Sequence, residues 1–137
     1  MIRSLKKLTK EEQPVQISMI LQERLPYFVQ GPCELQCDVW VEKAIDHYHL
    51  TVLAKGRVTV ICQRCLQPFD YDYDYKSDLA LCRNDSIAEK MMASSDCMVQ
   101  ADDALDLQAI VTDDLHLFCP EKHEDQLECD GVVSQYL

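Results

Sequence analysis

The chain has 137 residues, with 13 Lys and Arg against 24 Asp and Glu, and a formal net charge of −11 at pH 7. This length predicts one domain with a sizeable core, spanning residues 1–137. No stretch approaches the roughly 18 consecutive apolar residues that a membrane span needs.

The negative charge is concentrated in the second half of the chain. Residues 69–137 hold four of the Lys and Arg but 17 of the Asp and Glu. Because such a half repels phosphate backbones, extensive nucleic-acid binding through it is disfavoured, whereas a basic protein partner or simple solubility fits it. The basic start of the chain is not followed by a continuous apolar core, so it does not have the pattern of an export signal. We therefore expect a cytoplasmic protein, in which the eight cysteines are more consistent with free thiols or a metal site than with disulfides.

The first half of the chain predicts an antiparallel meander. Residues 1–13 are expected to form a polar N-terminal arm that could include a short helix. Apolar and polar side chains then alternate with the period of a strand. This pattern predicts strands at residues 15–20, 35–42, 48–54 and 58–61. Lys55-Gly56 offers a bend or bulge between the last two strands.

Residues 69–75 alternate perfectly between two side-chain types. Tyr71, Tyr73 and Tyr75 share one face of a predicted strand, and Asp70, Asp72 and Asp74 share the other. We expect the tyrosines to pack. The aspartates should be solvated or paired with Lys or Arg on a neighbouring strand, for which Lys55, Arg57 and Arg64 are candidates.

The second half predicts two helices. A short helix is expected at residues 87–92, followed by a short strand at residues 96–101. The strongest helix pattern runs from about Leu105 to Phe118 and ends before Pro120. Its predicted packing face consists of Leu107, Ile110, Val111, Leu115 and Phe118. Residues 130–137 are expected to be a short C-terminal tail. The predicted class is therefore α+β: an antiparallel β meander carrying a Cys-x-x-Cys hook, with a C-terminal amphipathic helix packed on it.

The hook, Cys62-Gln-Arg-Cys65, allows three interpretations. It could bind a metal, exchange electrons, or be two buried thiols. Zinc needs four ligands, and His123 with Cys129 would supply a second pair, with Cys119 as a spare. A thioredoxin-type site needs a helix after the first sulfur, but a strand is predicted there, which weakens the redox interpretation. The sequence shows no nucleophile elbow and no phosphate-binding glycine loop, so no catalytic or cofactor-binding residue is predicted and no small-molecule substrate is evident.

Two blocks of the sequence carry a resemblance to a known family. The first is Cys62-Gln-Arg-Cys65-Leu-Gln-Pro-Phe69. The second begins at Leu105-Asp106-Leu107 and continues through Asp113-Asp114-Leu115-His116-Leu117 to Pro120, His123 and Cys129. Over roughly residues 35–129 the chain resembles the YceD family, the large ribosomal RNA subunit accumulation proteins.

The resemblance implies a non-enzymatic accessory of large-subunit rRNA synthesis, processing or stability. Its partners would be ribosome-assembly proteins or a ribosomal precursor, with direct RNA contact left open. The matching positions are Cys62, Cys65, His123 and Cys129, whose residue types suggest a structural zinc site. Two departures are Glu121-Lys122, where the family usually has a proline, and an ending at Leu137 without the family's basic tail. The alternatives are an acidic protein–protein adaptor and a zinc- or thiol-dependent enzyme.

Overall fold

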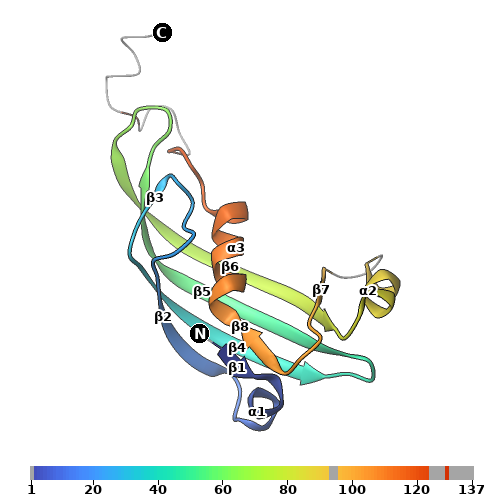
Figure 1. The fold of residues 1–137 in the computed structure, drawn as a ribbon. Coiled ribbons are helices and arrows are strands. Elements are labelled where there is room, and N and C mark those ends of the chain that lie inside the picture. Colours follow the sequence, from blue (N-terminus) through green and yellow to red (C-terminus); the bar gives the residue numbers. More distant parts are fainter. Residues whose placement is uncertain (1, 93–95, 124–128, 130–137) are drawn as a thin grey trace.

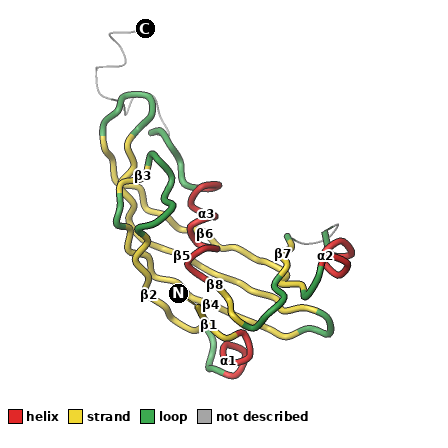
Figure 2. The backbone as a smooth tube through the Cα atoms, in the orientation of Figure 1, coloured by secondary structure: helices red, strands yellow, loops and turns green. Residues whose placement is uncertain are grey.

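The described part of the chain folds as a long, curved, mainly antiparallel sheet with three helices around it (Figure 1). The computed structural model describes residues 2–92, 96–123 and 129. In chain order the elements are β1 (Ile2–Ser4), α1 (Leu5–Lys10), β2 (Val15–Leu21), β3 (Val29–Gln30), β4 (Cys33–Lys43), β5 (His47–Ile61), β6 (Pro68–Cys82), α2 (Asp85–Met91), β7 (Cys97–Val99), β8 (Ala104–Asp106) and α3 (Leu107–Phe118). More of the described residues lie in strands than in helices, and α3 crosses one face of the sheet, as the tube in Figure 2 shows. These features confirm the predicted α+β class.

The main sheet has the strand order β2-β4-β5-β6-β7, and β3 pairs with the part of β5 that β4 does not reach. The pairings of β4 with β5 and of β5 with β6 are antiparallel and follow chain order, as expected for a meander. Only β7 is parallel to its described neighbour, β6. The short strands β1 and β8 form a separate antiparallel pair. This pair places the start of the chain beside the start of α3.

The two strands expected at residues 48–54 and 58–61 are one continuous strand, β5. Its register with β6 runs without a bulge through Gly56, which lies opposite Tyr73. A Cβ atom at Gly56 would lie 2.6 Å from the Glu34 carbonyl oxygen and 2.6 Å from Leu35 Cδ2. Glycine is therefore required here because β4 passes close to β5, and the bulge that was one of the two expectations is absent from the β5–β6 pairing.

Alternation along β6 sorts its side chains as the sequence predicted. Tyr73 is only 3% exposed, and Tyr71 and Tyr75 are half-buried against the core. Asp70, Asp72 and Asp74 are exposed on the opposite face. The tyrosines are thus a packing row and the aspartates a solvated one.

Helix α3 closes the core, although it begins two residues later than predicted. Leu105 and Asp106 belong to β8, and the Asp106 side chain caps the helix by accepting a hydrogen bond from the Ala109 N–H (3.1 Å). Four of the five predicted packing residues are buried: Leu107, Ile110, Val111 and Leu115. Each contributes on the order of 1.5–3 kcal/mol through burial, before conformational entropy is counted.

The prediction for the fifth residue, Phe118, is wrong. Its side chain is 44% exposed. Its ring stacks on Tyr75, with centroids 3.9 Å apart and an interplanar angle of 16°. The last turn of α3 therefore lies over a half-exposed tyrosine and not over the closed core, so Phe118 is covered on one side only.

The N-terminal segment also differs from the expected polar arm. Leu5 and Leu8 of α1 are each only 1% exposed and belong to the core. The first turn is held by Asp103, whose side chain accepts hydrogen bonds from the Lys6 N–H (2.9 Å) and from the Ser4 hydroxyl. Residues 2–10 are therefore structural, and their polar side chains only cover the outer side of α1.

The remaining helix and strand predictions agree with the structure. The helix expected at residues 87–92 is α2, capped by Asn84, whose side chain accepts from the Ile87 N–H (3.0 Å). The strand expected at residues 96–101 is β7. The C-terminal tail, residues 130–137, lies outside the described residues. Among the described residues no helix has the length and hydropathy to cross a membrane.

Candidate metal centre

The Cys hook is a tight turn between the two longest strands. Cys62 follows the last residue of β5, and β6 begins at Pro68. The Leu66 N–H donates to the Cys62 carbonyl (2.7 Å), and the Cys62 N–H donates to the Gln67 carbonyl (3.0 Å). Leu66 has a positive φ of 61°. The hook is therefore followed by a strand, as predicted, and not by the helix that a thioredoxin-type site requires.

The segment after α3 returns to this hook. The Gln63 N–H donates to the Glu121 carbonyl (2.9 Å), and Arg64 Nη2 donates to the His123 carbonyl (3.2 Å). The hydrogen bond of Arg64 thus goes to the segment after α3 and not to the aspartate row of β6. These contacts bring His123 beside Cys65, although the two are 58 residues apart in the chain.

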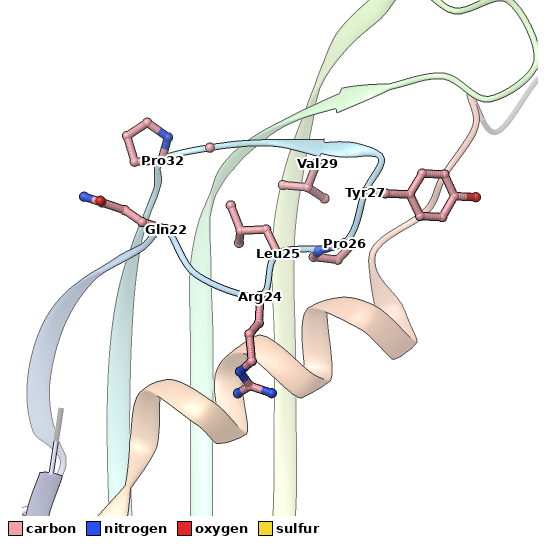
Figure 3. A pocket seen from close by; sticks show the side chains of 8 residues that line it. Gln22, Arg24, Leu25, Pro26, Tyr27, Val29 and Pro32 are labelled. Atoms are coloured by element: carbon pink, nitrogen blue, oxygen red, sulfur yellow. The ribbon is translucent and has the colours of Figure 1, made fainter.

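The loop between β2 and β4 braces the same segment from the other side. It lines an open hollow of about 580 Å³ (Figure 3). From this loop Arg24 points toward α3, where its guanidinium lies 3.5 Å from the Asp113 carboxylate. Tyr27 points toward the segment after α3, and its hydroxyl donates to the Glu121 carboxylate (3.3 Å). The loop therefore contacts both α3 and the segment that carries His123.

Four potential ligand atoms meet at this point, as the sequence predicted. The ligand atoms of Cys62, Cys65, His123 and Cys129 all lie within 4.8 Å of one another. Cys62 Sγ is 3.8 Å from Cys129 Sγ, and His123 Nδ1 is 3.7 Å from Cys65 Sγ and 3.5 Å from Cys129 Sγ. The group could hold a metal ion. The spare candidate Cys119 lies elsewhere, buried, with its thiol donating to the Pro120 carbonyl (3.7 Å).

The hook cysteines are deeply buried while the other two ligands are half-buried. Cys62 is 0% exposed and Cys65 is 3% exposed. The ring of His123 stacks on Phe69, the second residue of β6, with centroids 4.2 Å apart. This stacking partner was not predicted from sequence, although Phe69 is part of the block that carries the family resemblance.

The environment of the sulfurs favours one thiolate but resists a second. Burial of the Cys62 thiol acts to raise its pKa, but backbone N–H groups of Cys65, His123 and Arg64 directed at the sulfur lower the pKa to about 6. The pKa of Cys129 is raised to about 11, by burial and then by its interactions with the Cys62 and Cys65 sulfurs. Several thiolates at this spacing need a cation between them, because like charges in a partly desolvated site repel.

The other charged candidates have local partners. Arg57 Nε lies 3.3 Å from the Asp72 carboxylate, and Lys55 lies opposite Asp74 in the register. The basic residues of β5 therefore neutralise part of the aspartate row, as expected. The two histidines of β5 also lie beside carboxylates. His49 Nε2 is 3.9 Å from the Asp78 carboxylate, and His47 Nδ1 is 2.8 Å from the Asp46 carboxylate.

Comparison with known proteins agrees with the sequence blocks around this centre. Residues 50–136 match the family model described as large ribosomal RNA subunit accumulation protein YceD. The matched region contains all four clustered ligands. No curated protein and no solved structure among those compared matches the chain.

Proposed function

Since the chain belongs to the YceD family of large ribosomal RNA subunit accumulation proteins, we propose that it is a cytoplasmic, non-enzymatic accessory of large-subunit rRNA maturation. The family membership carries this proposal. We further propose that the Cys62, Cys65, His123 and Cys129 centre holds a structural zinc ion. The partners would be ribosome-assembly proteins or a ribosomal precursor.

The spacing of the ligand atoms supports zinc. Zinc–sulfur bonds of about 2.3 Å and zinc–nitrogen bonds of about 2.0–2.1 Å in a tetrahedron place two sulfurs about 3.8 Å apart and a sulfur and a nitrogen about 3.6 Å apart. Three of the six observed separations match closely: 3.8 Å between the sulfurs of Cys62 and Cys129, and 3.5 and 3.7 Å from His123 Nδ1 to the sulfurs of Cys129 and Cys65. All four ligand atoms lie within 4.8 Å of one another. Three thiolates and an imidazole also form a common ligand set of structural zinc.

A zinc ion here would join parts of the chain that are far apart in sequence. Cys62 and Cys65 lie in the β5–β6 turn, whereas His123 and Cys129 follow α3. Zinc binding would thus fasten the segment after α3 to the β5–β6 turn. Because four protein ligands leave no open position for water or substrate, the arrangement favours a structural over a catalytic role.

Metal analysis of the purified protein tests the zinc site. We expect about one zinc per chain, lost in Cys62→Ser and retained in Cys119→Ala, which removes a buried cysteine outside the group. Metal-free wild-type protein that is stably folded and does not take up zinc would contradict the proposal. Binding of zinc with equal affinity by Cys62→Ser would also contradict the ligand assignment.

Depletion of the protein in its host tests the role in rRNA. We expect mature large-subunit rRNA to fall relative to small-subunit rRNA, and a wild-type copy to restore it. A copy carrying Cys62→Ser and Cys65→Ser should restore it poorly, whereas Cys119→Ala should restore it fully. Normal large-subunit rRNA after clean depletion would exclude the proposed function, whatever the metal analysis gives.

A further inference from the structure

The face of the main sheet opposite α3 carries a row of three residues that the fold and the metal centre do not explain. Trp40 on β4 lies opposite Thr51 on β5, which lies opposite Asp78 on β6. Trp40 is half-buried and Asp78 is exposed. Side chains on this outer face alternate with the buried set that α3 covers, so the row faces away from the core.

This row lines a recess of about 340 Å³. The residues around it are Trp40, Glu42, His49, Thr51, Lys76 and Asp78. Thr51 is itself buried, at 8% exposed, and its hydroxyl donates to Asp78 Oδ1 (2.7 Å). The Asp78 carboxylate is therefore held by a hydrogen bond on the lining of the same recess as Trp40.

The recess lies within an acidic surface. Among the residues paired across β4, β5 and β6, from the Glu42 row to the Asp70 row, the carboxylates on the outer face are Asp38, Glu42, Asp70, Asp72, Asp74 and Asp78. The Lys and Arg on the same rows are Lys55, Arg57 and Lys76. Arg57 is already paired with Asp72 at 3.3 Å. The surface thus has an excess of negative charge in a chain whose formal net charge is −11.

We propose that this outer acidic face, defined by the six carboxylates and Trp40, binds a basic polypeptide segment and that the recess receives one of its arginine side chains. A guanidinium over the Trp40 indole would gain a cation–π contact, for which tryptophan is the best ring. Glu42 and Asp78 flank that position with carboxylates, and arginine matches carboxylates in a planar, two-point geometry.

An RNA strand fits this surface poorly. Six carboxylates against three cations repel phosphates, and the only tryptophan of the chain shares its recess with two of these carboxylates, Glu42 and Asp78. The basic polypeptide would be the partner through which the protein acts in rRNA maturation, and to that extent the inference rests on the proposed function. Binding itself can be measured without any reference to rRNA.

The single tryptophan makes the test direct. Titration of the full-length protein with a nona-arginine peptide should change Trp40 fluorescence in a saturable way, and the affinity should fall as salt is raised from about 50 to about 300 mM. Glu42→Gln with Asp78→Asn should weaken binding about three- to tenfold. Trp40→Phe, followed with a labelled peptide, should weaken it about two- to fivefold. Lys76→Gln should strengthen it, since it removes a cation from the recess.

A charge-matched control separates the site from the net charge. Glu11→Gln with Glu12→Gln removes two exposed carboxylates from the segment between α1 and β2, which is not part of this face, and should leave the affinity unchanged. Equal weakening of peptide binding by both double variants would overturn the proposal that the recess binds arginine. Failure of the nona-arginine peptide to bind at low salt would overturn it as well. Tighter binding of a single-stranded RNA oligomer than of that peptide would also overturn it. Thermal unfolding of each variant shows whether misfolding causes a loss of affinity. Intact peptide binding together with normal rRNA after depletion would reject the proposed function but not the peptide-binding face.

Discussion

Phe69 and His123 stack with their ring centroids 4.2 Å apart and their planes inclined by 29°. One ring belongs to the second residue of β6 and the other to the segment after α3. The contact leaves His123 Nδ1 directed at the sulfurs of Cys65 and Cys129. It therefore orients a ligand from one end of the chain against cysteines held by the middle of the chain.

Replacing Phe69 should weaken metal binding without removing a ligand. We expect Phe69→Leu to lower zinc affinity on the order of tenfold, because residues that orient a ligand have effects of this size. Competition with a chelator measures the change. Phe118→Leu is the matched control, since it removes a phenylalanine that stacks on Tyr75 and not on a residue of the cluster. Equal loss of affinity in both variants would contradict a specific role of the Phe69 ring.

Glycine at position 56 should be required by the close approach of β4. Gly56→Ala should lower the free energy of unfolding by about 1–3 kcal/mol, because its Cβ would meet the Glu34 backbone oxygen at 2.6 Å. Gly31→Ala should cost less, since the Cβ there would meet only the flexible end of Leu25, at 2.5 Å. Urea unfolding compares the two, and a larger loss in Gly31→Ala would refute the argument.

The two leucines at the end of α3 should differ sharply. Leu115 is 0% exposed, so Leu115→Ala should lower the free energy of unfolding by about 2–5 kcal/mol. Leu117 is 73% exposed, and Leu117→Ala should stay within about 0.5 kcal/mol of the wild type. Chemical unfolding with unchanged m-values measures both, and similar losses would mean that α3 packs through another face.

Asp103 should make the attachment of α1 depend on pH. Its pKa is lowered, first by the hydrogen bond from the Ser4 hydroxyl and then by the Lys6 N–H. A carboxylate with a lowered pKa in the folded state adds stability above its unfolded pKa of about 3.9 and loses it as the pH falls through the folded pKa.

We therefore expect Asp103→Asn to lower the melting temperature near neutral pH and to converge with the wild type in strong acid. Asparagine keeps an acceptor for the Lys6 N–H but cannot carry the charge. Glu12→Gln, which removes an exposed carboxylate from the neighbouring loop, is the control and should show no such convergence. A difference between Asp103→Asn and the wild type that stays constant from neutral pH to strong acid would contradict the linkage.

Much of the local structure could be predicted because it depends on short-range patterns. The alternation of Tyr71, Tyr73 and Tyr75 with the aspartates shows directly which side of β6 is buried, since neighbouring side chains in a strand point to opposite faces. The helical period likewise identified four of the five packing residues of α3. The prediction that Phe118 is buried was wrong because the helical period places a residue on a face of the helix but does not show how far the core extends beneath that face.

The N-terminal segment could not be predicted for a different reason. Leu5 and Leu8 are spaced as one face of a single helical turn, which is too short a pattern to distinguish from a polar arm. Their burial depends on β8, about 100 residues later, which pairs with β1 and brings Asp103 to the start of α1.

For the metal centre, the sequence by itself determined the types of ligand and the turn that holds the first pair. Cys62 and Cys65 are three residues apart, and a tight turn keeps such a pair together in any fold. Only the tertiary structure decided that His123 and Cys129 complete the group and that Cys119 does not. A distance between residues 58 to 67 positions apart is set by the pairing of strands and the path of α3, and no local period of the sequence contains it.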